Sequence, residues 1–211
     1  MKRVINLDNW NRKEHFKFFS ALDDPFWGIT TTVDFTSIYQ QSKNMEVSFF
    51  LYSVHFLLKC INATTAFKLR IENGEVVEYD KINISPTSGR EDGTFGFGFF
   101  EYDTDLSLFI ENAEKEIHRV KNSTGLSFSK DTARADVIRY SALPWFAFSE
   151  MKHAGSIQTG DSIPKISTGK LIQEKKKLLL PISISVHHGL VDGRNVAEFI
   201  QNVKDGQNNT L

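Results

Sequence analysis

The most regular pattern of apolar and polar positions lies near the C-terminus. Apolar residues occupy every second position over 178–186, which predicts a strand because successive side chains of a strand point to opposite faces. After Gly193 the apolar residues recur at helical spacing, and Asp192 stands where a helix N-cap is expected. The sequence therefore predicts a strand, the histidine pair His187 and His188, a tight turn and a helix.

Helical spacing also predicts helices at residues 10–19, 45–62 and 105–121. The helix at 45–62 is apolar around much of its circumference, so we expect it in the interior of the protein. His55 lies on this helix without accompanying partner residues, and we interpret it as a structural histidine. The helix at 105–121 is amphipathic.

Further strands are predicted from β-branched and alternating residues at 4–7, 29–35, 67–71, 76–79, 94–102 and 137–143. The Asn73-Gly74 pair between two of these strands predicts a hairpin. Residues 94–102 alternate Phe with Gly, which indicates either close approach of another chain or ligand, or a tightly packed core strand. Residues 85–93, 123–136 and 151–168 are predicted to be loops, the last one a surface loop or an open edge.

Strands and helices alternate irregularly around this hairpin. We therefore predict an α/β (α+β-like) fold in which helices pack on a mixed β-sheet. The 211 residues fit one domain, 1–211, and no repeat or linker divides them.

Composition narrows the possible partners and the compartment. The formal net charge is −1 and no basic block interleaved with aromatic residues occurs, so no nucleic-acid partner is predicted. No apolar run approaches the ~20 residues that span a membrane, and the N-terminus lacks the apolar core of a signal peptide. Cys60, the single cysteine, cannot form an internal disulfide, so we predict a cytoplasmic protein. Eighteen phenylalanines serve the core or line an apolar pocket.

His187, His188 and Asp192 allow three kinds of chemistry when considered alone. Adjacent histidines on a strand point to opposite faces, which makes a poor chelate, and no third ligand is apparent, so no metal is predicted. The sequence contains no Gly-x-Ser-x-Gly elbow and Cys60 lies in an apolar helix, so a covalent nucleophile lacks support. A structural pair and a general base both remain open.

Four stretches together resemble one family. His187-His188-x-x-x-Asp192-Gly193, residues 9–16 (Asn-Trp-x-Arg-Lys-Glu-His-Phe), residues 141–145 (Ser-Ala-Leu-Pro-Trp) and residues 178–181 (Leu-Leu-Leu-Pro) are similar, in residues and spacing, to signatures of the chloramphenicol acetyltransferases. The shorter His-x-x-x-Asp-Gly pattern also occurs in dihydrolipoamide acyltransferases and in condensation domains of non-ribosomal peptide synthesis.

The resemblance implies an acetyl-CoA-dependent O-acetyltransferase with a small-molecule hydroxyl acceptor. His188 would be the general base, and Ser141 would donate a hydrogen bond to the tetrahedral oxyanion. Arg12 and Asp192 would form a structural ion pair. Ser167 would help to order a water molecule. The segments that contact coenzyme A would contain Trp145 and Lys170.

The resemblance further implies a homotrimer with its active sites at the subunit interfaces. Positions around the acceptor pocket would be those of Phe18, Phe19, Phe95 and Phe128. The sequence departs from the family in this pocket at Asp23, Pro25, Met151 and His153, and on the coenzyme A side at Leu171 and Ser48.

Three alternatives follow from these departures. The acceptor can be a hydroxyl compound other than chloramphenicol, in which case resistance to that antibiotic does not result. The chain can form a catalytically silent trimer that binds an apolar ligand, although the complete set of His188, Asp192, Arg12 and Ser141 speaks against this. A dihydrolipoamide acyltransferase is disfavoured because a lipoyl segment is missing.

Overall fold

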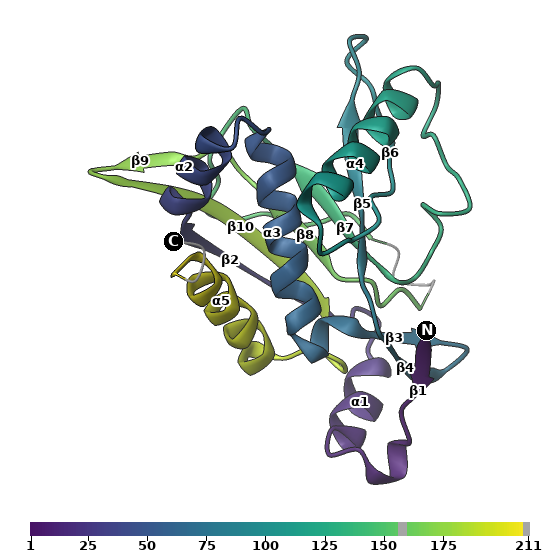
Figure 1. Cartoon of the computed structure of the whole chain (residues 1–211). Coiled ribbons are helices and arrows are strands. Elements are labelled where there is room, and N and C mark those ends of the chain that lie inside the picture. Colours follow the sequence, from purple (N-terminus) through teal and green to yellow (C-terminus); the bar gives the residue numbers. More distant parts are fainter. Residues whose placement is uncertain (156–159, 209–211) are drawn as a thin grey trace.

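The computed structural model describes residues 1–155 and 160–208, and a mixed β-sheet is its central element (Figure 1). Strand β7 is parallel to β5 and β8, whereas β10 runs antiparallel to β2, β8 and β9. The order across the sheet is β2 (Phe26–Asp34), β10 (Lys177–His187), β8 (Lys165–Thr168), β7 (Val137–Ala142), β5 (Asn83–Gly89) and β6 (Phe95–Phe97), with β9 (Ile172–Glu174) on β10. The predicted mixed sheet packed by helices is confirmed.

Helices cover one face of this sheet. In Figure 1, the helices in front of the strands are α2 (Thr36–Asn44), α3 (Phe49–Ala63), α4 (Leu106–Lys121) and α5 (Gly193–Asn208). Helix α3 is the innermost, and its Val54, Leu57 and Leu58 are almost completely buried. Ile166 and Ile184 lie in the same core. The expectation of an interior helix is therefore confirmed.

The other face of the sheet is polar. Because side chains alternate along a strand, the residues between the buried isoleucines point away from the helices. The strand registers place these residues side by side. We call them the polar sheet face: Ser85, Thr87, Arg139, Ser141, Lys165, Ser167, Ser183 and Ser185.

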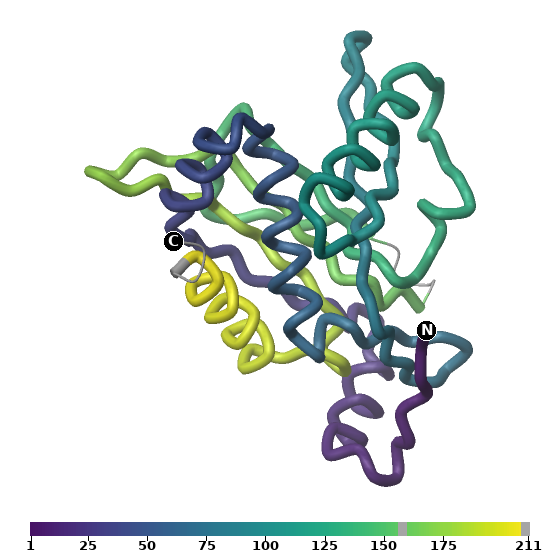
Figure 2. The backbone as a smooth tube through the Cα atoms, in the orientation of Figure 1, coloured from purple at the N-terminus to yellow at the C-terminus, as the bar shows by residue number. Residues whose placement is uncertain are grey.

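A smaller sheet lies beside the N-terminus (Figures 1 and 2). It contains β1 (Lys2–Val4), β4 (Glu75–Tyr79) and β3 (Leu69–Glu72). Asn73 and Gly74 join β3 to β4 with positive φ angles of 51° and 82°, as a type I′ turn requires. The predicted hairpin is confirmed. Helix α1 (Lys13–Ser20) stands at the lower end of the molecule, after the short 3-10 helix η1 (Leu7–Asn9); a second 3-10 helix, η2 (Thr65–Lys68), follows α3.

Several sequence predictions were wrong in detail. The strand expected at 4–7 lies at Lys2–Val4, and Leu7 begins a 3-10 helix. The helix expected at 45–62 begins only at Phe49, and the separate helix α2 precedes it; Glu46, between them, has a φ of 55°. Residues 83–89, expected in part as loop, form the interior strand β5. Residues 165–168, expected in a surface loop, form the buried strand β8. Polar residues occupy one face of both strands, so their sequences resemble loops and the strands were not predicted.

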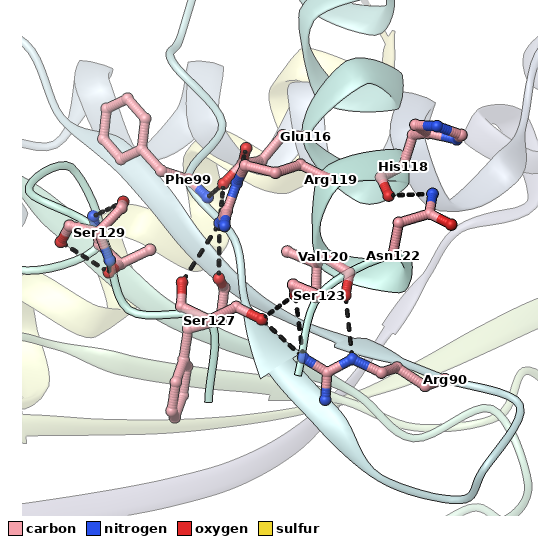
Figure 3. A network of polar contacts seen from close by, with 12 residues as sticks. Arg90, Phe99, Glu116, His118, Arg119, Val120, Asn122, Ser123, Ser127 and Ser129 are labelled. Carbon is pink, nitrogen blue, oxygen red and sulfur yellow. Dashed lines mark hydrogen bonds and ion pairs between the residues drawn. The ribbon is translucent and has the colours of Figure 1, made fainter. Parts of the chain in front are cut away.

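The Phe–Gly stretch forms only a short strand, held by a polar network at α4 (Figure 3). Gly96 has no room for a side chain, because a Cβ there would lie 2.9 Å from a Val120 methyl group. The Arg90 guanidinium donates to the Val120 carbonyl at 2.9 Å and to the Ser127 hydroxyl at 2.6 Å. Arg119 donates to the carbonyls of Phe97 and Ser127. Tight packing therefore accounts for this glycine, and the network fixes the segment that leads to Phe128.

Candidate active site

The main chain at the end of β10 is held at several points. The His188 N–H donates to the Pro25 carbonyl at 2.8 Å. The Arg12 guanidinium donates to the His188 carbonyl at 3.3 Å and also binds the Asp192 carboxylate. The Trp27 indole N–H donates to the Val191 carbonyl at 3.0 Å. Contacts from two distant parts of the chain, Arg12 and residues 25–27, thus fix the backbone on both sides of His188.

The His188 side chain is positioned by aromatic rings. It stacks on Phe19 with ring centroids 3.8 Å apart and an interplanar angle of 14°, and it lies 5.5 Å from the Trp27 ring. Its Nδ1 atom is buried without a hydrogen-bond partner among the described residues, so Nε2 is the nitrogen left for an acceptor. A neutral imidazole with its lone pair on Nε2 can remove a proton from a hydroxyl group.

Asp192 combines two structural roles. Its Oδ1 accepts hydrogen bonds from the backbone N–H groups of Arg194 at 2.9 Å and Asn195 at 3.2 Å, which is the N-cap predicted for α5. Its other oxygen binds Arg12. Burial alone would raise the pKa of Asp192, but the hydrogen bonds from Arg12 and Asn195 outweigh burial and lower it. The carboxylate is therefore ionised at neutral pH and links α5 to the segment before α1.

His187 is buried and supports the turn. Its Nδ1 accepts from the Gly189 N–H at 3.2 Å, and burial is the main reason that its pKa falls to about 4. The ring is neutral at pH 7. Gly189 has little room for a side chain, because a Cβ would lie 3.1 Å from the His187 ring and 3.2 Å from the Ser20 hydroxyl. The turn after β10 therefore depends on glycine at this position.

The second half of the site lies on the polar sheet face. Ser141 on β7 is paired in register with Ser167 on β8, so their Cα atoms are one strand spacing apart, about 4.8 Å. The hydroxyls of Thr87 and Ser141 are 2.9 Å apart. These residues line a cleft of about 830 Å³. The lining also includes Phe97, Arg139, Met151, His153, Asp161 and Lys165.

His153 and Ser167 form a pair in this cleft. The His153 Nε2 lies 3.0 Å from the Ser167 hydroxyl, and Ser167 is completely buried. Burial, and secondly the charge of Lys165, lowers the pKa of His153, so its imidazole is neutral at pH 7. That Ser167 helps to order a water molecule stays a prediction, and His153 is one partner of its hydroxyl group.

A second hollow, of about 650 Å³, adjoins the cleft and shares Met151, His153 and Lys165 with it. Pro25 and His187 also line this hollow. Its acidic lining residues are Asp24, Glu150 and Asp161, and the expected Asp23 is not among them. The structure thus brings Pro25, Met151 and His153 to adjoining cavities.

The phenylalanines expected around the acceptor lie in two groups. Phe19 stacks on His188, and its neighbour Phe18 is 64% exposed. Phe128 stacks on Phe97 at 5.4 Å but is 69% exposed, and Phe95 packs against Phe97 edge-on. Both groups present uncovered aromatic surface.

The cleft also contains residues that the sequence did not suggest as a site: Thr87, Phe97, Arg139, Asp161 and Lys165. The signal that could have found two of them is spacing, because Arg139 precedes Ser141 by two positions and Lys165 precedes Ser167 by two. Residues two apart on a strand share a face.

The residues expected to contact coenzyme A lie near each other at one edge. Trp145 is 73% exposed, and the Lys170 N–H donates to the Phe146 carbonyl at 2.9 Å, next to Trp145 in the chain. Leu171 packs partly against the core, and Ser48 is exposed at the start of α3. An exposed indole and an exposed ammonium suit an extended, anionic ligand with a flat ring system.

The two halves are far apart within one chain. Ser141, Ser167 and Ser183 are register partners on β7, β8 and β10, and His188 follows Ser183 by five residues. Two strand spacings across and five residues along the sheet separate the Cα atoms of Ser141 and His188 by roughly 20 Å. Their side chains cannot reach the same reacting group within one chain.

The whole described architecture matches known proteins. The sequence profile described as "Chloramphenicol acetyltransferase" matches residues 2–204. The chain belongs to the chloramphenicol acetyltransferase family. It is 27% identical over 208 residues to chloramphenicol acetyltransferase 3 of Escherichia coli, covering 98% of this chain and 97% of that protein. It is also 27% identical to the chloramphenicol acetyltransferase of Clostridioides difficile, covering 95% of this chain and 93% of that protein.

A solved structure agrees with this assignment. A chloramphenicol acetyltransferase superposes with a TM-score of 0.90 and 29% identity, over 98% of this chain and all of the other. A dihydrolipoamide acetyltransferase of Azotobacter vinelandii shares the fold at a TM-score of 0.70 and 13% identity, over 92% and 85% of the two chains. Membership in the family makes the chain an acyltransferase, an O-acetyltransferase that depends on acetyl-CoA.

No helix within residues 1–155 and 160–208 is long and apolar enough to cross a membrane. No group of three or more His, Cys, Asp or Glu side chains there is arranged to hold a metal ion.

Proposed function

We propose that His188 is the general base of direct acetyl transfer to an acceptor hydroxyl. Its Nε2 takes the hydroxyl proton while the oxygen attacks the thioester carbonyl carbon of acetyl-CoA. The carbonyl oxygen becomes an oxyanion and accepts a hydrogen bond from Ser141. The C–S bond then breaks, and the thiolate leaves and takes the proton from the imidazolium, so that the O-acetyl product and coenzyme A form and His188 is neutral again.

The observation that carries this proposal is the setting of His188. Its backbone is fixed by Arg12 and Pro25, its ring is held flat against Phe19, and Nδ1 is enclosed. With Nδ1 enclosed, Nε2 is the ring nitrogen that can meet an acceptor hydroxyl. A general base needs this lone pair in a fixed direction, and the stacked Phe19 ring supplies that direction.

We propose that the chain acts as a homotrimer in which His188 of one subunit meets Ser141 of the next. The separation of roughly 20 Å within one chain supports this, because a base and an oxyanion donor must both reach one reacting centre. The exposed rings of Phe18, Phe128 and Trp145 supply surface for such packing. A single acyltransferase domain over residues 1–211 belongs to the same proposal.

The acceptor is a small hydroxyl compound, and chloramphenicol is the first candidate because the relatives carry its name. Resistance to chloramphenicol would then follow in a host that expresses the protein. A cytoplasmic location suits acetyl-CoA as co-substrate and a buried lone thiol at Cys60.

The test is release of the coenzyme A thiol over a panel of hydroxyl compounds that includes chloramphenicol. General-base catalysis is typically worth about 10²–10⁴-fold, so His188→Ala should lower the rate by that factor while the oligomer, measured by sedimentation, persists. A silent binding protein would release no thiol with any acceptor. Full activity of the assembled His188→Ala variant would exclude His188 as the base.

A further inference from the structure

Arg139 is an exposed cation in the middle of an interior strand. Strand β7 lies between β5 and β8, where buried residues are the rule, and the flanking residues Ile138 and Tyr140 are buried. The Arg139 side chain is nevertheless exposed, because it belongs to the polar sheet face. It lines the cleft of about 830 Å³ together with Ser141.

A second cation lies directly beside it. Arg139 and Lys165 are register partners on β7 and β8, and like charges opposite each other on neighbouring strands destabilise a sheet. Lys165 has its own counter-charge, the Asp161 carboxylate at 3.2 Å, and its ammonium also lies 4.2 Å from the Phe26 ring centroid. Within the described residues, no carboxylate or other hydrogen-bond acceptor is paired with the Arg139 guanidinium.

The charged side chains that line the cleft therefore have a net charge of +1. Its lining contains Arg139, Lys165 and Asp161 as charged groups, while His153 is neutral because its pKa is lowered. A guanidinium presents a planar set of donors that suits carboxylate and phosphate groups. A free guanidinium at the wall of a cleft that holds the acceptor is thus suited to bind an anionic group of that acceptor.

The position of Arg139 also sets the geometry of the ligand. Arg139 and Ser141 share a face two residues apart, roughly 6.6 Å along the strand. Since Ser141 marks the place of the oxyanion, an anion held by Arg139 lies within a few bonds of the oxygen that receives the acetyl group.

We infer that Arg139 forms an anion subsite, and that the preferred acceptor is a hydroxyl compound with a carboxylate or phosphate group near its reacting hydroxyl. This inference rests on the proposed function, because it assumes that the cleft holds the acceptor. It differs from the proposed function in naming the charge of the acceptor.

The experiment uses matched acceptors that differ only in charge. The assembled protein is assayed for thiol release with para-(hydroxymethyl)benzoate, with the corresponding neutral amide and with para-(hydroxymethyl)phenyl phosphate. Hydrogen bonds to charged groups commonly contribute the equivalent of about 10- to 100-fold in affinity. Arg139→Gln should lower kcat/KM for the anionic acceptors by that factor and leave the amide within about threefold. The carboxylate and phosphate arms show which anion is preferred.

Three further variants sharpen the result. Arg139→Lys keeps the charge and should retain part of the preference. Arg139→Glu should reverse it in favour of the amide. Arg3→Gln removes an exposed arginine on β1, outside the cleft lining, and should change none of the three rates.

Several outcomes would overturn the inference. Equal losses for the amide and the carboxylate would show that Arg139 is not an anion subsite. A rise in KM for acetyl-CoA alone would place Arg139 on the coenzyme A phosphates instead. A weaker oligomer with an unchanged preference would mean that Arg139 pairs with a carboxylate of another subunit.

A binding measurement separates this inference from the proposed function. Calorimetry of the three compounds with the His188→Ala variant, with and without Arg139→Gln, reports on the subsite without turnover. If no compound is acetylated but the anions bind through Arg139, the proposed reaction fails and the subsite stands. If acetylation occurs without any preference for anions, the subsite fails and the reaction stands.

Discussion

The two halves of the candidate site are built in different ways. The His188 half is a turn fixed by long-range contacts, since Arg12, Pro25 and Phe19 reach it from the N-terminal region. The Ser141 half is fixed by strand register, since β5, β7 and β8 place Thr87, Ser141 and Ser167 in line.

The difference shows which part of the site is adjustable. The turn around His188 depends on one ion pair, one glycine and a stacked ring, so a single change there should disturb the whole turn. The sheet holds the main chain of the Ser141 half independently of its side chains. Substitutions on the polar sheet face can therefore change the acceptor without changing the fold.

The largest expected effect is on the turn. Arg12→Ala would leave the partly buried Asp192 carboxylate without its partner. Removing one member of a buried ion pair costs about 3–5 kcal/mol, and the partial exposure of Asp192 favours the lower end of that range. Denaturant unfolding and thiol release should both show the loss. A matched control, Arg3→Ala, removes a largely exposed arginine from Glu78, which keeps Lys68 as a partner, and should cost less than about 1 kcal/mol. Equal losses would contradict the special role given to the turn.

His187 should make the stability of this half depend on pH. Burial lowers its pKa from 6.5 to about 4, so below pH 6.5 the unfolded chain binds a proton that the folded chain does not. The buried, neutral His187 thus contributes to the free energy of unfolding. This contribution is fully present above pH 6.5 and is lost as the pH falls towards 4, in total roughly 3 kcal/mol.

The check is denaturant unfolding at fixed protein concentration between pH 7 and pH 4.5. His187→Gln does not titrate in this range and keeps an acceptor for the Gly189 N–H, so its stability should fall less steeply with acidification. Parallel curves for the variant and the unsubstituted protein would show that His187 is not the group responsible.

The smallest effect is expected on the Ser141 side, at Thr87. A serine hydroxyl has one proton, so Ser141 can donate to an oxyanion only if it does not donate to Thr87. If Thr87 donates to Ser141, it directs the Ser141 proton into the cleft. Thr87→Val should lower kcat about tenfold, the equivalent of one modest hydrogen bond, with little change in KM. Thr87→Ser should restore the rate.

A double-variant comparison decides whether Thr87 acts through Ser141. Once Ser141→Ala is in place, adding Thr87→Val should cost almost nothing more. Additive losses would mean that Thr87 contributes to the reaction in another way.

The sequence predicted the His188 half better than the Ser141 half for physical reasons. Period-two alternation in β10 and the N-cap at Asp192 are strong local signals. Strands β5 and β8 carry polar residues on the face that lines the cleft, so their sequences look like loops. Arg139 and Lys165 were overlooked because only the strand register shows that they are neighbours. The contact of Arg12 with Asp192 spans 180 positions and came from the family resemblance alone.

The central claim is that His188 of one subunit works with Ser141 of another. Two variants, His188→Ala and Ser141→Ala, are unfolded together, refolded as a mixture and assayed for thiol release, with each variant treated alone as a control. In a cyclic oligomer with random mixing, about one interface in four would contain both an intact His188 and an intact Ser141. Recovery of about a quarter of the unsubstituted activity is therefore expected. A mixture that assembles, as sedimentation shows, yet is no more active than the average of the two variants would contradict the claim.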